Sequence, residues 1–133
     1  MNLDDTLTLE QLSVSFSTDD GVLPAVHAVS LSLPPAGITC LVGESGCGKS
    51  LTARTILHLL PENAHISGRI LFRGRDLRTM TPEEMRALRG RHIAMIFQEP
   101  MTSLNPVLKV GMQTAEPLRL HLGLSRSEAR REV

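Results

Sequence analysis

The sequence predicts an α/β fold in which a small antiparallel β layer precedes a core built on a parallel sheet. Two changes of pattern carry this prediction. Apolar and polar residues alternate before residue 33, as in strands with one solvated face. Residues 38–42 instead have no polar face, and residues 93–97 are wholly apolar, as in strands covered on both faces. A glycine-rich loop and an amphipathic stretch follow the first apolar run. The length of 133 residues suits one small domain or part of a larger one.

The antiparallel layer is predicted from the alternating segments. Residues 7–16 place apolar side chains at every second position, with one slip at residues 10–11 that predicts a β-bulge. A turn over residues 18–21 follows. A second alternating strand over residues 29–33 ends at the proline-containing turn of residues 34–37.

Helix signals predict the later elements. The helix after the glycine-rich loop is expected to end at Pro61 and to bury one apolar face, made of Ala53, Ile56, Leu57 and Leu60. Residues 70–72 predict a short edge strand. Capping boxes at residues 81–84 and 125–128 predict two helix starts, and Gly90 is expected to end the first of these helices.

Composition and charge exclude several classes of protein. The charges of the 14 basic and 14 acidic residues cancel, so the net charge gives no support for a nucleic-acid partner. The apolar runs are far shorter than the ~20 residues of a membrane helix, and the acidic N-terminus lacks the basic region of a signal peptide. Cys40 and Cys47 form no CxxC pair, so neither a disulfide framework nor a zinc site is expected.

The glycine-rich loop carries the clearest chemical signal. It matches the pattern G-x-x-x-x-G-K-[ST] with the residues Gly43, Glu44, Ser45, Gly46, Cys47, Gly48, Lys49 and Ser50. Glycines let the backbone approach a ligand, so that successive N–H groups point at phosphate oxygens, and the following helix adds its positive dipole end. Lys49 supplies charge for the β- and γ-phosphates, and the Ser50 hydroxyl can ligate Mg²⁺. The residues predicted to bind the nucleotide also include Leu51. Cys47 is interpreted as a small loop residue, because no histidine or acid is paired with it.

Residues 95–106 read MIFQEPMTSLNP, and this run is similar to a segment of a known protein family. This run resembles the Q-loop of ABC-transporter ATPases, in the form of the oligopeptide, dipeptide and nickel importer branch. The spacing from the glycine-rich loop and the pattern of the first 30 residues resemble that branch too. The resemblance implies a P-loop NTPase core with an incomplete parallel sheet and an N-terminal antiparallel β layer in residues 1–106. Residues 107–133 would then be the start of a helical subdomain, cut within the domain.

The resemblance also implies roles for particular residues. Phe16 matches the aromatic residue that stacks on adenine, against the alternative of a core strand residue. Gln98 matches the Q-loop glutamine, which contacts Mg²⁺ and the attacking water. Residues 98–105 would contact integral-membrane permease subunits. The implied cofactors are ATP and Mg²⁺. The other implied partners are a second ATP-binding subunit and, indirectly, a substrate-binding protein, and the implied location is peripheral, at the cytoplasmic face of the inner or plasma membrane.

Three family motifs are missing from these 133 residues: the signature motif, the Walker B acidic pair and the switch histidine. The chain alone is therefore expected to bind nucleotide at most and not to hydrolyse it. Two alternatives remain open at this point. One is a soluble ABC-type ATPase of DNA repair or chromosome maintenance, which salt-dependent DNA binding would reveal. The other is a P-loop kinase or GTPase, which nucleotide preference would reveal.

Overall fold

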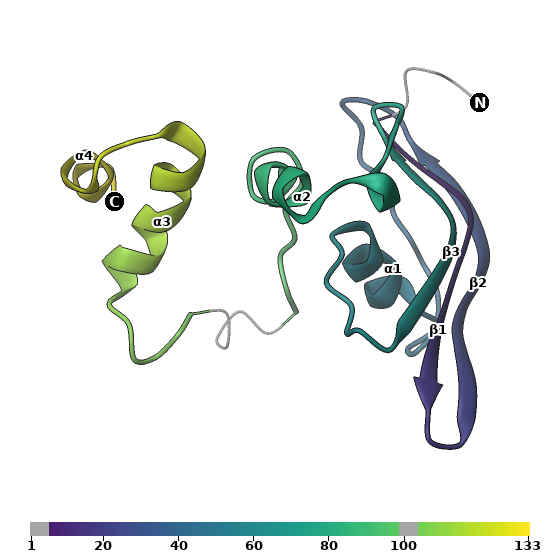
Figure 1. Ribbon diagram of the computed structural model, residues 1–133. Coiled ribbons are helices and arrows are strands. Elements are labelled where there is room, and N and C mark those ends of the chain that lie inside the picture. Colours follow the sequence, from purple (N-terminus) through teal and green to yellow (C-terminus); the bar gives the residue numbers. More distant parts are fainter. Residues whose placement is uncertain (1–5, 99–103) are drawn as a thin grey trace. The chain divides into compact units, whose positions relative to one another are not determined.

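The computed structural model describes residues 6–98 and 104–133, and the chain divides into two compact units, Met1–Met85 and Arg86–Val133 (Figure 1). The first unit holds β1 (Leu7–Thr18), β2 (Gly21–Leu33), α1 (Lys49–Ile56), β3 (Ala64–Phe72), β4 (Arg75–Asp76) and the 3-10 turn η1 (Leu77–Thr79). Helix α2 (Pro82–Leu88) follows. The second unit holds α3 (Val110–Leu122) and α4 (Arg126–Arg131).

The sheet of the first unit has the order β2-β1-β3-β4, and each neighbouring pair is antiparallel. One face of β1 is buried, as its alternating side chains predict, and α1 lies against the sheet (Figure 1). The largest fully buried side chains of the sheet are Leu9, Leu12, Val14 and Ile70, each at most 1% exposed. The core of this unit also includes the buried residues Leu7, Val26, Leu57, Phe72, Leu77 and Met85.

The predicted bulge in β1 is confirmed. The register of β1 shifts between Leu9 and Leu12 against β2, and between Glu10 and Ser13 against β3. Gln11, inside the bulge, has a φ of 48°, and its backbone N–H and side-chain amide both donate to the Ser30 hydroxyl at 2.9 and 3.0 Å. The extra residue lets Leu12 return to the buried face after Leu9.

The prediction of a short edge strand at residues 70–72 is wrong in length and in place. β3 begins at Ala64 and lies between β1 and β4. In residues 64–69 the less polar Ala64, Ile66 and Gly68 alternate with His65, Ser67 and Arg69, and this segment joins the sheet by pairing with β1. Strand β4 pairs with Leu71 and Phe72 of β3 and leaves the rest of that edge of β3 without a strand beside it. The Arg78 guanidinium covers part of this edge, where it donates to the carbonyl oxygens of Ile66 (2.8 Å) and Gly68.

The runs at residues 38–42 and 93–97 do not form the parallel strands that were predicted. Residues 38–42 have no strand pairing, and Ile38 and Val42 are 98% and 89% exposed. In residues 93–97, Ile93 makes one isolated parallel bridge with Arg89, and Ile96 is 95% exposed. An apolar run shows what a segment can bury, whereas a strand needs a neighbour for its ladder hydrogen bonds. Among the described residues neither run has such a neighbour.

Helix α1 also differs from its prediction. It ends at Ile56, and its buried residues are Thr52 and Thr55 rather than Ala53 and Ile56. Both hydroxyls donate to the carbonyl one turn back, Thr52 to Gly48 at 3.0 Å and Thr55 to Leu51 at 2.7 Å. Because these polar atoms are satisfied within the helix, the threonines can face the core. Leu57, just beyond the helix, is buried as expected.

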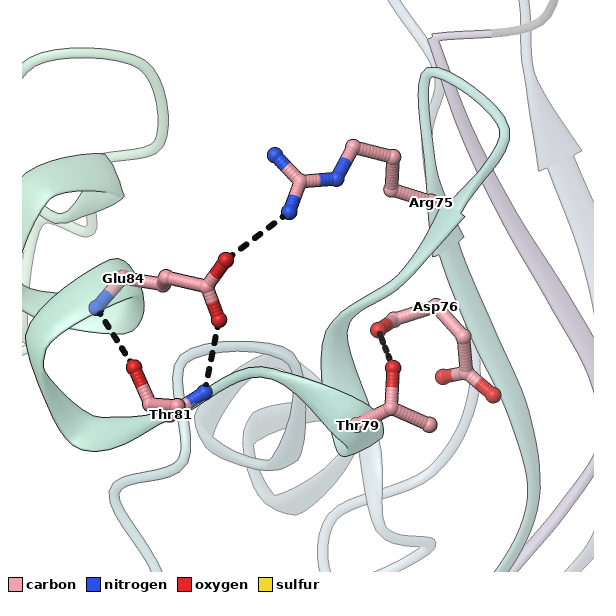
Figure 2. A network of polar contacts seen from close by, with 5 residues as sticks. All are labelled: Arg75, Asp76, Thr79, Thr81 and Glu84. Carbon is pink, nitrogen blue, oxygen red and sulfur yellow. Dashed lines mark hydrogen bonds and ion pairs between the residues drawn. The ribbon is translucent and has the colours of Figure 1, made fainter.

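The capping box predicted at the start of α2 is confirmed (Figure 2). The Thr81 N–H donates to Glu84 Oε2 at 2.9 Å, and the Glu84 N–H donates to Thr81 Oγ1 at 3.3 Å. The second carboxylate oxygen of Glu84 accepts from Arg75 at 3.0 Å. Nearby, the Thr79 hydroxyl donates to the Asp76 carbonyl oxygen at 2.9 Å and fixes the turn that precedes the helix.

We expect this network to make the start of α2 sensitive to acid. The hydrogen bond from the Thr81 backbone, followed by that from Arg75, holds the pKa of Glu84 below its ordinary value of 4.5. A carboxyl whose pKa is lower in the folded than in the unfolded chain stabilises the fold above the unfolded pKa, and this contribution is lost as pH falls through the folded pKa. We expect Glu84→Gln to unfold at lower urea concentration than the parent at about pH 6, and the gap to close below about pH 4.

The control for this pH series is Glu83→Gln, which removes a carboxylate from the same first turn of α2. Urea midpoints measured across the pH range for the parent and both variants decide the matter. If the Glu83 and Glu84 variants follow the same pH profile, the capping box is not the source of the acid sensitivity.

In the second unit, α3 ends at Leu122 and is capped by Gly123, whose φ of 68° is left-handed, and α4 follows. The predicted capping box at the start of α4 is present, with Ser125 and Glu128 bonded in both directions. Helices α3 and α4 pack against each other, and Ala115 of α3 and Ala129 of α4 are buried. No helix in the described parts of the chain is long and apolar enough to cross a membrane.

Candidate functional site

The glycine-rich loop leads into the N-terminus of α1. Residues 43–47 are exposed, and the Cys47 N–H donates to the Glu44 carbonyl at 3.4 Å, which closes a turn. Gly48 is the N-cap of α1, with a left-handed φ of 92°, and no side chain caps the helix. The first N–H groups of a helix have no partner within it. Those of α1 are therefore available to an anion, together with the positive end of the helix dipole.

Lys49 lies inside the curve of the loop. Its ammonium group donates to the carbonyl oxygens of Gly43 at 2.7 Å and Glu44 at 2.6 Å, and it lies 3.4 Å from the Cys47 sulfur. A lysine has three N–H donors, so these contacts use all of them. Sulfur is the weakest of the three acceptors. A phosphate oxygen that takes the place of the thiol would therefore leave the two carbonyl contacts intact.

Two glycines of the loop leave room that a side chain would fill. A Cβ on Gly43 would lie 2.7 Å from the Cys47 sulfur, and a Cβ on Gly48 would lie 3.1 Å from both the Ala25 oxygen and Val26 Cγ2. Ala25 and Val26 of β2 thus form the floor on which the loop rests. The glycine pattern predicted a loop whose backbone can approach a ligand, but only the fold shows which strand lies beneath it.

Phe16 lies on the sheet face that carries this floor. Val14 pairs with Val26, and Phe16 is two residues further along β1, so its side chain points to the same face as Val14. Phe16 is half-buried, whereas Val14 is fully buried. A half-buried aromatic beside the loop floor fits both a stacking surface and a partial core residue, and its stacking role stays a prediction.

The other predicted site residues are in different environments. Ser50 is exposed in the first turn of α1, and Leu51 follows it half-buried. Gln98 is exposed and belongs to the second unit. Of residues 98–105, which were predicted to contact permease subunits, residues 99–103 lie outside the described residues. The structure describes Gln98, Leu104 and Asn105, and all of them are exposed.

The residues of the loop fit a magnesium nucleotide by their chemistry. Mg²⁺ is commonly held by substrate phosphates together with few protein oxygens and several waters. In the described parts of the chain, no group of three His, Cys, Asp or Glu residues could hold a metal ion. The Ser50 hydroxyl at the helix N-terminus supplies a single oxygen ligand beside the predicted phosphate position, which suits an ion held mainly by phosphates.

Sequence reasoning missed one arrangement near the end of residues 98–105. The side-chain amide of Gln113, in α3, accepts a hydrogen bond from the Asn105 N–H and donates one to the Asn105 carbonyl oxygen. Asn105 precedes Pro106, a pair typical of turns, and this was the only local signal. The contact itself depends on how the turn brings Asn105 back to α3, which no periodicity reveals.

Comparison with known proteins identifies the family. The family model described as ABC transporter matches residues 26–132. The dipeptide transport ATP-binding protein of Bacillus subtilis is 47% identical over an alignment of 133 residues that covers 98% of this chain and 40% of that protein. The oligopeptide transport ATP-binding protein of Escherichia coli is 44% identical over 95% of this chain and 37% of its own length.

A solved structure supports the fold class. A dimeric ATP-binding cassette, MJ0796, in a post-hydrolysis state bound to ADP and Pi, superimposes with a TM-score of 0.74 over 94% of this chain and 53% of that chain. Its identity of 20% makes this a likeness of fold alone. The chain spans about two fifths of the length of the two curated relatives. The resemblance inferred from residues 95–106 is confirmed by a family match that covers most of the sequence, and this chain belongs to the ABC transporter family.

Proposed function

We propose that this chain binds Mg–ATP at residues 43–51 and serves in the ATP-binding subunit of an ABC importer of peptides. The observation that carries the proposal is the loop itself. Its lysine is held by two carbonyl oxygens beside an uncapped helix N-terminus, and the floor beneath the loop leaves little room for a side chain at residue 48, whose φ is left-handed. An uncapped helix N-terminus with an ammonium group beside it suits a chain of phosphates.

Each predicted residue has a role in this proposal. The backbone N–H groups of residues 43–51 bind phosphate oxygens, Lys49 neutralises the β- and γ-phosphates, and Ser50 ligates Mg²⁺. Phe16 stacks on the adenine ring. Gln98 is the residue that contacts Mg²⁺ and orients water for hydrolysis, and hydrolysis needs a signature motif, an acidic pair and a histidine that these 133 residues do not contain.

The substrate and partners follow from the relatives. The two relatives described above are named for dipeptide and oligopeptide transport, which favours peptides over nickel. Membership of the ABC transporter family leaves the kinase, GTPase and DNA-repair alternatives without support. We propose permease subunits as partners of residues 98–105, a second ATP-binding subunit, and indirect work with a substrate-binding protein. The subunit would be peripheral, at the cytoplasmic face of the membrane.

The direct test is a calorimetric titration of the purified chain with ATP, with and without Mg²⁺, followed by an assay for phosphate release. We expect saturable ATP binding that weakens when Mg²⁺ is chelated, and no turnover above the level without protein. Absence of saturable binding would overturn the nucleotide site. Steady hydrolysis by the chain alone would overturn the assignment of hydrolysis to motifs that the chain lacks.

A further inference from the structure

Leu23, in β2, is an exposed apolar residue directly opposite Phe16 of β1. Because the two residues are paired across the strands, their side chains point to the same face of the sheet, with Cβ atoms about 5 Å apart. Leu23 is 57% exposed, and Phe16 is half-buried. One exposed leucine is common on protein surfaces. Two adjacent apolar side chains on the face that carries the loop floor form a surface that a flat ring can cover.

A bulge in β2 places Leu23 on this face. Val14 pairs with Val26, the next residue of β1 pairs with Pro24, and Ala25 is the extra residue between these two pairs. In a regular strand, residues three positions apart point to opposite faces of the sheet. The extra residue lets Leu23 and Val26 point to the same face. Leu23 therefore lies on the same face of the sheet as the floor of the glycine-rich loop.

Phe16 and Leu23 lie where the base of a nucleotide bound to the loop is expected. Gly48, at the N-terminus of α1, lies against Val26, which pairs with Val14. Phe16 is two residues further along β1, which is about 7 Å. A ribose separates the phosphates of ATP from its base. A base is therefore expected beside the loop floor rather than over it, on the part of the face that Phe16 and Leu23 form.

Of the two residues paired with Phe16, Leu23 offers the larger apolar area. On the other side, Phe16 pairs with Ala64 of β3, whose side chain is one methyl group. The two fused rings of adenine are larger than a phenyl ring, so a base stacked on Phe16 extends past its edge. Apolar area that the base covers stabilises binding roughly in proportion to that area, and most of it lies on the β2 side.

We propose that Leu23 is a second base-binding residue, which forms with Phe16 one apolar platform for the adenine ring of ATP. The inference rests on the proposed function, in which Phe16 stacks on adenine and residues 43–51 bind the phosphates. Leu23 packs against the part of the base that extends past the phenyl ring toward β2. It contributes nothing to the binding of inorganic tripolyphosphate, which has the phosphates of ATP but no base.

The test compares Mg–ATP with Mg–tripolyphosphate, each titrated calorimetrically into the full chain. Leu23→Ser removes most of the apolar area, and Leu23→Met keeps it. The matched control is Val22→Ser, because Val22 is 69% exposed but pairs with Ser17 and so points to the opposite face of the sheet. Phe16→Ala tests the base site of the proposed function separately.

We expect Leu23→Ser to weaken ATP binding about three-fold to ten-fold and to leave tripolyphosphate affinity within about two-fold of the parent. Leu23→Met and Val22→Ser should bind both ligands as the parent does. Phe16→Ala should weaken ATP binding by about ten-fold or more, again without an effect on tripolyphosphate. A loss confined to the ligand that has a base is a result that a general folding defect would not give.

Several outcomes would overturn the inference. If Leu23→Ser weakens binding of both ligands, the substitution acts on the loop or the fold. If Val22→Ser weakens ATP binding as much as Leu23→Ser, the effect belongs to the β1–β2 hairpin as a whole. If Phe16→Ala weakens ATP binding but Leu23→Ser does not, the base stacks on Phe16 without reaching Leu23, and the proposed function stands without this inference. If the parent binds neither ligand, or Phe16→Ala binds ATP as the parent does, the proposed function fails first, and the role of Leu23 fails with it.

Discussion

Replacing Gly68 by alanine is expected to lower the free energy of unfolding by about 4 kcal/mol or more, enough to unfold a marginally stable domain. Gly68 has a φ of 86° and faces the bulge of β1. A Cβ there would lie 2.5 Å from the Glu10 carbonyl oxygen and 2.6 Å from the Gln11 carbonyl carbon, and still closer to the Gln11 oxygen. Contacts this short with backbone atoms can be relieved only by moving a strand.

Neither strand is free to move. On the β1 side, Gln11 is tied to Ser30 of β2 through its backbone N–H and its side chain. On the other side, Arg78 donates to the carbonyl oxygens of Ile66 and Gly68. Moving either strand to admit a methyl group therefore breaks hydrogen bonds as well as the packing of the buried leucines.

The matched control is Gly74→Ala. Gly74 has a similar φ of 78°, but a Cβ there would meet nothing within 4 Å. Its substitution should cost only the left-handed backbone strain, about 1–2 kcal/mol. The gain from restricting the unfolded chain is the same for both glycines and cancels in the comparison. Urea unfolding followed by circular dichroism gives both values, and equal losses within about 1 kcal/mol would contradict the assigned role of Gly68.

The features that could be predicted from sequence are those that depend on neighbours in the chain. The bulge at residues 10–11 follows from a break in alternation, because the buried face must resume with Leu12. Both capping boxes follow from side chains that reach backbone groups within one helical turn. The match at residues 43–50 is local in the same sense, since its glycines and lysine act on one short loop.

The features that sequence reasoning missed depend on distant partners. Residues 38–42 and 93–97 are apolar enough for buried strands, but pairing needs a neighbour that composition does not supply. The buried face of α1 was assigned by apolarity, whereas Thr52 and Thr55 can be buried because each hydroxyl finds a carbonyl in its own helix. The position of Val26 beneath Gly48 depends on the pairing of β1 with β2 and the packing of α1 on the sheet.

Lys49→Ala is expected to weaken ATP binding by about 10- to 100-fold, which corresponds to the loss of about 1.4–2.7 kcal/mol of binding free energy. Lys49 is the first lysine or arginine in the sequence, and its ammonium group lies within the curve of the loop. Hydrogen bonds to charged groups are worth more than neutral ones, and alanine leaves the phosphates with backbone N–H donors alone.

The same substitution should change stability little. The Gly43 and Glu44 carbonyls that lose their partner belong to exposed residues, so water can replace the lysine at small cost. The control is Arg54→Ala, which removes a positive charge from the last turn of the same helix. It should leave ATP affinity within about two-fold of the parent, because the effect of charge on a helix end falls off within a turn.

Calorimetry with ATP and urea unfolding, each measured on the parent, Lys49→Ala and Arg54→Ala chains, distinguish three explanations for a loss of ATP affinity. A loss of affinity confined to Lys49→Ala, with unchanged unfolding midpoints, means that the ammonium acts on the ligand. Equal losses in both variants would mean that net charge alone attracts ATP, and raising the salt concentration would then weaken binding to all three chains. A lower unfolding midpoint for Lys49→Ala would instead mean that Lys49 holds the loop together, with weaker binding as a consequence of a disordered site.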